Sequence, residues 1–252
     1  MRQGKHVLCE KPLGRNTAEA ESMLESAKQN SVILKTGFNH RHHPAIAKAK
    51  EVADSGEIGG IMFLRCRYGH GGRPGYEKEW RADKNLCGGG ELLDQGVHVV
   101  DMFRWFAGDF DEAFGYTRTC FWDMDVEDNA FAMFTNKTGV VAMMHTSWTQ
   151  WKNLFSFEVF GEDGYLIVDG LGGSYGTETL KIGKRKLQGG APDEQMLEFP
   201  WKDVSWQLEW QEFTSSIKQN TQPIGSGWDG YQAEKMLDAV RQAAQTGKAA
   251  KI

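Results

Sequence analysis

The sequence has no long basic run and no apolar stretch of membrane-spanning length. Its 252 residues carry 29 Lys and Arg against 34 Asp and Glu, which gives a net charge of −5. Nucleic-acid-binding proteins usually show a basic patch, and a membrane-spanning helix needs about 20 apolar residues. Arg2, Lys5 and His6 also interrupt any apolar core of a signal peptide. These absences predict a soluble, cytoplasmic protein without a nucleic-acid or membrane partner.

Cysteine is scarce and scattered. The four cysteines lie at positions 9, 66, 87 and 120, and no two of them form a CxxC pair. A disulfide framework or a structural zinc site would need paired cysteines, so buried and reduced thiols are expected. Glycine and tryptophan are plentiful instead, at 30 and 9 residues. That composition is typical of strands joined by tight turns, with aromatic side chains that must be buried.

The first 38 residues predict a strand, a helix and a second strand. Residues 5–9 are strand-like, and Asn16 precedes a helical segment with Glu19 in its first turn. The segment SVILKTGFN, residues 31–39, is again apolar. This order is one parallel crossover unit, and its apolar strands indicate a sheet covered on both faces.

The remaining chain predicts a much larger sheet with flanking helices. Several strands are expected between residues 113 and 168, including a hairpin that turns at 135–139, and a further strand pair is expected near 178–200. Other expected elements are a helix at 45–55, a strand at 61–69, a long loop at 71–90, a strong helix at 91–106 and two closing helices at 206–218 and 230–246. The predicted fold class is α+β, with an α/β remnant followed by a large, mostly antiparallel sheet.

The strongest chemical signal lies in the helix expected at 91–106. Its composition is apolar enough for burial nearly all round, yet Asp94, His98 and Asp101 share one stripe at spacings of four and three residues. A carboxylate one turn from a histidine can orient the ring and tune its charge. A stripe that simply faces solvent is the alternative. The three glycines at 88–90 would allow a close backbone approach or a tight entry to the helix.

A second signal is Glu10-Lys11-Pro12, directly after the first strand. Ligands of open parallel sheets bind outside the carboxyl ends of the strands, where a lysine could contact a substrate hydroxyl. An ordinary surface lysine in a loop is the alternative reading.

The segment GFNHRHHP, residues 37–44, brings three histidines together. No local carboxylate or cysteine completes a metal-ligand set, so we expect no metal and favour residues that line a sugar site or form a turn. No GxSxG elbow, P-loop or GxGxxG fingerprint is identified in the strand-to-helix context that gives each its chemistry. Nucleophilic hydrolysis and nucleoside triphosphate binding therefore have no support.

Taken together, VLCEKPLGRNTAEAESM, TGFNHRHHP and GGGELLDQGVHVVDMFRW resemble the Gfo/Idh/MocA family of oxidoreductases. The resemblance implies an N-terminal Rossmann domain that binds NAD or NADP. It also implies a C-terminal domain whose large sheet covers the substrate and mediates oligomerisation. By this resemblance, residues 1–38 are the C-terminal remnant of the Rossmann domain, and residues 39–252 are the substrate-binding and oligomerisation domain.

The resemblance also implies roles for individual residues. Lys11 would hold the substrate hydroxyl, His98 would be the general base, and Asp94 would contact substrate and assist the histidine. Glu10, Lys11 and Pro12 would lie near the nicotinamide ribose. Substrate contacts are expected from Asn39, Arg41 and Trp80, although packing in a core or an interface is the alternative for any tryptophan.

The expected function is NAD(P)-dependent oxidation of a hydroxyl of a sugar, cyclitol or nucleotide sugar by a homo-oligomer. Because the glycine turn that would hold the cofactor's pyrophosphate is not identified, we expect the chain by itself to be inactive. The alternatives are a non-catalytic sugar-binding or oligomerisation module, and one half of a split enzyme.

Overall fold

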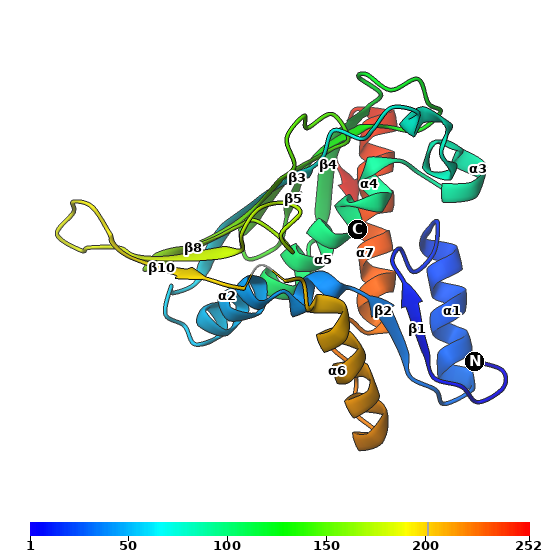
Figure 1. Cartoon of the computed structure of the whole chain (residues 1–252), viewed down its shortest axis with the longest axis horizontal. Helices are drawn as coiled ribbons and strands as arrows, with labels where there is room; N and C mark the ends of the chain where they lie inside the picture. The colour runs from blue at the N-terminus through cyan, green and yellow to red at the C-terminus, as the bar shows by residue number, and fades with distance from the viewer. Residues whose placement is uncertain (201) are drawn as a thin grey trace.

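The structure, a computed structural model, describes residues 1–200 and 202–252, and these form a small sheet and a large one. In the small sheet β1 (Val7–Glu10) pairs in parallel with β2 (Leu34–Gly37), and α1 (Thr17–Gln29) connects them. Figure 1 shows this crossover unit at one end of the molecule, beside α7 (Gly227–Thr246). The predicted strand, helix and strand are confirmed.

The start of α1 follows from its sequence. The Asn16 side chain accepts a hydrogen bond from the Glu19 backbone N–H, which satisfies one of the unpaired donors of the first turn. Ala20 and Ala27 are buried against the small sheet, with Leu13 and Leu34 in the same cluster. One helix stripe therefore attaches α1 to β1 and β2.

The large sheet of the described residues has nine strands in the order β10-β9-β8-β7-β3-β6-β5-β4-β11. Every neighbouring pair is antiparallel except β3 with β6. The strands are β3 (Ile61–Gly69), β4 (Glu112–Arg118), β5 (Asn129–Thr135), β6 (Val141–Ser147), β7 (Leu154–Gly161), β8 (Gly164–Asp169), β9 (Thr179–Lys184), β10 (Asp193–Glu198) and β11 (Ala250–Lys251). The predicted α+β class with a mostly antiparallel sheet is confirmed.

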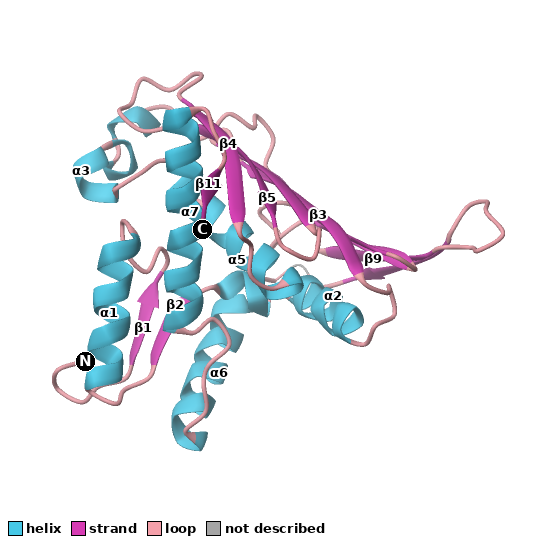
Figure 2. Ribbon diagram, turned by 180° about the vertical axis from the view of Figure 1, so that it is seen from behind, coloured by secondary structure: helices cyan, strands magenta, loops and turns pink. Residues whose placement is uncertain are grey.

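Helices cover one face of the large sheet, as Figure 2 shows. They are α2 (Pro44–Asp54), α5 (Gly96–Ala107) and α7, and α6 (Ser205–Gln219) extends away from the sheet. Along β6, Ala142 and Met144 are buried beneath the helices, while Met143 between them is 41% exposed on the opposite face. This alternation is the pattern of a sheet with one face in the core.

The C-terminal helix α7 joins the two parts, because it packs on α1 and β2 as well as on β4. The approach to β2 depends on Gly230, where an added Cβ would lie 2.3 Å from Thr36 Oγ1. Only a residue without a side chain permits this contact. A helix from the end of the sequence thus supports the first 38 residues.

The helix predicted as one element at 91–106 is interrupted. The segment α4 (Glu91–Asp94) ends before Gln95, and α5 starts at Gly96. Glu127 holds the start of α4 in place, since it accepts hydrogen bonds from the N–H groups of Gly90, Glu91 and Leu92. Periodicity does not report this tertiary anchor of α4.

The loop predicted at 71–90 also contains short helical turns. They are η2 (Tyr76–Lys78), η3 (Trp80–Ala82) and α3 (Lys84–Cys87), and a further turn, η1 (Asn39–His42), precedes α2. Among the residues that the structure describes, no helix is long and apolar enough to cross a membrane.

Candidate active site

A cavity of about 190 Å³ lies where the end of β1, the turn η1 and the start of α5 meet. Four residues singled out from the sequence line it, namely Glu10, Lys11, Asn39 and His98. The parallel pairing of β1 with β2 brings the carboxyl end of β1 beside η1, which follows β2 directly. Polar groups from three separate stretches of sequence thus converge on one hollow.

Lys11 and Asp94 form an ion pair at the edge of this cavity. Lys11 Nζ donates to Asp94 Oδ1 at 2.8 Å and also to the Asp94 carbonyl oxygen. Burial raises the pKa of the Asp94 carboxyl, but Lys11, with Arg81 and His70, outweighs burial and holds that pKa below its usual value. Asp94 is therefore a carboxylate at neutral pH and fixes the position of the lysine ammonium.

His98 is 4% exposed and lines the cavity from the first turn of α5. Its Nδ1 is buried and has no hydrogen-bond partner among the described residues, so Nε2 is the nitrogen available to a ligand. Burial lowers the pKa of the imidazole well below its usual value, and the nearby His40, Lys11 and His43 act in the same direction. The ring is thus neutral and can accept a proton.

The expected contact between Asp94 and His98 takes a different form. The carboxylate of Asp94 bonds Lys11, and among the described residues no hydrogen bond joins it to His98. Asp101, one turn after His98 in the same helix α5, is paired with Arg41.

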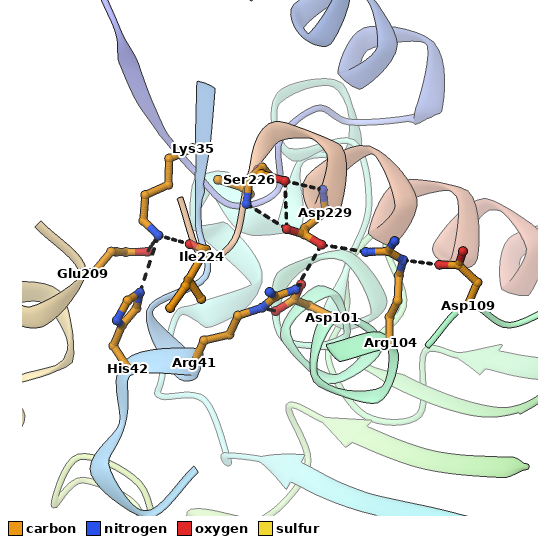
Figure 3. A network of polar contacts seen from close by, with 11 residues as sticks. Lys35, Arg41, His42, Asp101, Arg104, Asp109, Glu209, Ile224, Ser226 and Asp229 are labelled. Carbon is orange, nitrogen blue, oxygen red and sulfur yellow. Dashed lines mark hydrogen bonds and ion pairs between the residues drawn. The ribbon is translucent and has the colours of Figure 1, made fainter. Parts of the chain in front are cut away.

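Arg41 belongs to a buried ionic network at the junction of η1, α5 and α7 (Figure 3). Its guanidinium donates to both carboxylate oxygens of Asp101, from Nε at 2.8 Å and from Nη2 at 2.6 Å. Asp229 lies 3.4 Å from the same Nη2, and Arg104 joins Asp229 at 2.6 Å. These ion pairs give Arg41 a structural role, and its contact with substrate stays a prediction.

The three histidines of GFNHRHHP point to three different partners. His43 Nδ1 lies 2.6 Å from Glu178 Oε1, while His42 Nε2 lies 3.5 Å from the buried ammonium of Lys35. His40 stacks on His98, with the ring centroids 3.7 Å apart and the planes 16° from parallel. Within the described part of the chain, no group of three or more His, Cys, Asp and Glu side chains could hold a metal ion.

Trp80 lines a separate hollow from the cavity that contains His98. It is 56% exposed and borders a smaller hollow of about 30 Å³ together with Pro12 and Asp94. Arg81 packs over its indole at 4.5 Å. This position next to Asp94 is compatible with the substrate contact predicted for Trp80.

Sequence reasoning missed two tyrosines of the cavity wall. Tyr68 comes from β3, and Tyr175 comes from the loop after β8. Gln95 Nε2 donates to the Tyr175 hydroxyl at 3.0 Å. The segments singled out from the sequence include neither tyrosine, and the packing of the large sheet against η1 and α5 brings both to the site.

Two segments that were not singled out match general motifs letter by letter. GSGWDG, residues 225–230, has the GxGxxG spacing, and GGSYG, residues 172–176, has the GxSxG spacing. In the first, the Ser226 hydroxyl and the Asp229 carboxylate cap the start of α7, so an acidic group already occupies the end where a pyrophosphate would bind. The second lies in a turn between β8 and β9 and not at a strand-to-helix elbow.

The chain matches two parts of one enzyme family. The family described as "Oxidoreductase family, NAD-binding Rossmann fold" matches residues 1–38, and the "GFO/IDH/MocA C-terminal domain" matches residues 46–167. The 1,5-anhydro-D-fructose reductase of Ensifer adhaerens is 30% identical over 254 residues, which cover all of this chain and 74% of the reductase. The levoglucosan dehydrogenase of Pseudarthrobacter phenanthrenivorans is 28% identical over 66% of this chain and 50% of its own length.

Solved structures share the fold. A levoglucosan dehydrogenase in complex with NADH superposes with a TM-score of 0.90 at 23% identity, over all of this chain and 74% of that one. At this identity the likeness is one of fold, and it includes both the small sheet and the large one.

Proposed function

The chain belongs to the Gfo/Idh/MocA family of NAD(P)-dependent oxidoreductases, and on that premise we propose that it oxidises a hydroxyl of a sugar or cyclitol. The observation that carries the proposal is that Lys11 and His98 open onto the same small cavity, while Asp94 holds Lys11 through an ion pair of 2.8 Å. A lysine ammonium held by a carboxylate, beside a neutral histidine, is suited to bind a hydroxyl group and remove its proton.

Each residue has a distinct part in the proposed reaction. Lys11 donates a hydrogen bond to the substrate oxygen and stabilises negative charge as it develops there. His98 accepts the hydroxyl proton at Nε2, and Asp94 keeps Lys11 oriented through the 2.8 Å ion pair. Bound NAD or NADP supplies the hydride acceptor.

The residues at the end of β1 fit the nicotinamide half of that cofactor. Glu10 offers carboxylate oxygens as acceptors for ribose hydroxyls, and Glu10 and Lys11 open on the cavity that also contains His98. Pro12 borders the adjoining small hollow. The choice between NAD and NADP rests with groups at the adenosine end of the cofactor.

The cavity wall supports a polyhydroxylated substrate. Asn39, Ser174 and Tyr175 present amide and hydroxyl groups, and Trp206 adds an aromatic face. Such a mixture suits a sugar ring, whose edges are polar and whose faces are apolar. We keep Asn39, Asp94 and Trp80 as proposed substrate contacts. Relatives whose names refer to a levoglucosan dehydrogenase and to a 1,5-anhydro-D-fructose reductase support this class.

We also propose the division at residue 38, with residues 1–38 as the dinucleotide-binding part and residues 39–252 as the part for substrate and assembly. The uncovered face of the large sheet presents large apolar side chains, and Phe131, Met133 and Met143 are each more than 40% exposed. Burial of this face against a second copy would remove that surface from water. Light scattering should therefore give the mass of two or more chains of 28.3 kDa each. A monodisperse monomer would contradict the proposed assembly.

Cofactor binding by the purified 252-residue chain is the first test, followed through energy transfer from tryptophan to NADH or NADPH. Saturable binding, followed by oxidation of a sugar or cyclitol that is lost in His98→Asn, supports the proposed function. The comparisons do not support the expectation that the chain by itself is inactive, and this experiment decides it. Tight sugar binding without cofactor binding would instead favour a non-catalytic sugar-binding module.

A further inference from the structure

His98 lacks the hydrogen bond that normally orients a catalytic imidazole. In most such sites the second ring nitrogen donates to a carboxylate or a carbonyl, which fixes both the tautomer and the ring plane. Here Nδ1 is buried without a partner among the described residues. Rotation about χ2 of histidine is soft, so another contact must set the plane of the ring.

The ring of His40 makes that contact. It covers one face of His98 at a centroid separation of 3.7 Å, with the two planes 16° from parallel. Phe38 meets His98 edge-on at 6.2 Å. A buried ring with a stacked face against it and a second ring at its edge can tilt very little, because protein interiors are packed too densely to leave free space around it.

His40 is itself held firmly. Its Nδ1 donates to Asn39 Oδ1 at 3.1 Å, and Asn39 Nδ2 donates in turn to Ser205 Oγ at 3.0 Å. This chain of two hydrogen bonds assigns the proton of His40 to Nδ1. The rings of Tyr68 and Phe155 pack around it with centroids 5.4 and 6.1 Å away. His40 is therefore a rigid surface against which His98 rests.

We propose that His40 is a positioning residue for His98, and that its stacked ring fixes the plane of the base in place of a hydrogen bond to Nδ1. That His40 orients the His98 ring rests on the stacked geometry. That this orientation matters for catalysis rests on the proposed function, in which His98 is the base. It gives the histidine segment after β2 a part in the reaction other than metal binding or direct contact with substrate.

The stack also sets how many protons the two rings can hold. Rings 3.7 Å apart cannot both be cationic without strong repulsion, so the pair takes up one proton at most near neutral pH. Lys11 and His43 further oppose protonation of either ring. The acidic and phenolic groups on the same cavity are Glu10, Tyr68, Tyr175 and Asp203. When His98 accepts a proton, His40 must remain neutral.

The test uses the full chain with ¹⁵N-labelled histidine, wild type and as His40→Ala and His40→Phe. Long-range ¹H–¹⁵N spectra recorded over a pH series report the tautomer and protonation of each ring without any cofactor. In His40→Ala, the His98 ring should be free to tilt, so its signals should shift and broaden, and it should begin to titrate at higher pH than in the wild type. His40→Phe keeps an aromatic face and should restore His98 signals close to those of the wild type.

His145→Phe is the matched control, because His145 also stacks on an aromatic ring, that of Phe131, with centroids 4.1 Å apart. It lies in the large sheet and should leave the His98 signals unchanged. Circular dichroism and the melting temperature establish that each variant is folded. Should His40→Ala fail to fold, His40→Phe and Asn39→Ala, which releases His40 from its hydrogen bond, still decide the question.

Unchanged His98 spectra in His40→Ala would overturn the proposal, and so would equal changes in the Ala and Phe variants. If sugar oxidation is found, kcat of His40→Ala should fall by up to about 10²-fold with little change in KM, and His40→Phe should recover most of it. If no sugar is oxidised, the proposed function fails, yet the spectra still show whether the stack positions His98.

Discussion

The ammonium of Lys11 lies 2.8 Å from the carboxylate of Asp94, although the two residues are 83 positions apart in the sequence. Lys11 follows the first strand of the small sheet, and Asp94 ends the short helix α4, which Glu127 anchors. Their contact therefore depends on how the first 38 residues sit against the helical face of the large sheet.

Replacing Asp94 by Asn should remove the charge that holds Lys11 while the size of the side chain is kept. We expect kcat/KM for sugar oxidation to fall by about 10²–10⁴-fold, the range typical of a lost acid–base contribution. Lys11→Met should have a similar effect, and the double variant should lose less than the sum of the two. Strictly additive losses would show that the pair does not act as a unit.

Removing one partner of the buried ion pair between Arg41 and Asp101 should strongly lower the stability of the fold. Asp101→Asn removes one of the two carboxylates that balance the positive charge of the buried Arg41 guanidinium. We expect the free energy of unfolding to fall by about 3–5 kcal/mol. Urea denaturation measures it. The control is Glu51→Gln, which breaks the exposed pair of Glu51 with Lys48 at 2.7 Å and should cost about 0.5 kcal/mol or less. Equal losses would contradict the structural role of Arg41.

Glu234 on α7 should make stability fall as the pH rises. It is fully buried, neither of its carboxylate oxygens has a partner among the described residues, and burial raises its pKa from 4.5 to about 8. Because the folded-state pKa is the higher one, its stabilising effect is complete below about pH 4.5 and is lost as the pH rises through about 8.

Glu234→Gln should therefore gain stability relative to the wild type between pH 5 and 8, by up to about 1.4 kcal/mol for each pH unit. Unfolding in urea at several pH values checks this difference. Glu21→Gln, at an exposed position on α1, is the control and should show no such trend. A wild-type and Glu234→Gln difference that is constant with pH would contradict the raised pKa.

Gly90→Ala should disturb the start of α4 and with it the position of Asp94. An added Cβ would lie 2.0 Å from the Glu127 carbonyl oxygen, so the backbone must move. We expect a loss of about 1–3 kcal/mol in stability together with lower activity. Gly89→Ala is the matched control, since its Cβ would meet no atom closer than Leu93 Cβ at 3.3 Å. A neutral Gly90→Ala would mean that Glu127 does not anchor α4.

Much of the fold could be predicted from local pattern. The strand, helix and strand of residues 5–39 and the capping Asn16 follow from apolar periodicity and residue preference, as does the hairpin between β5 and β6. The anchor of α4 at Glu127 could not be predicted, because Glu127 lies 37 positions after Gly90, whose N–H it accepts. Periodicity reports the burial of a segment but not the contacts that it makes with distant residues.

For the candidate site, too, local pattern predicts the residues but not their contacts. Motif and spacing were sufficient to single out Lys11, Asp94 and His98 as chemistry-bearing residues. They could not show that Asp94 bonds Lys11 and not His98, or that Asp101 turns away to Arg41. Helical spacing places side chains on a face, whereas their partners come from other elements.

The sequence by itself determined the α+β class, the family and the residue types of the site, because these depend on short patterns and on the order of elements along the chain. Only the tertiary structure decided which groups meet. The stack of His40 on His98 joins residues from η1 and α5, and Tyr175, which lines the same cavity, comes from the loop after β8. Such contacts arise from the packing of separate elements around a common core, and no local pattern encodes them.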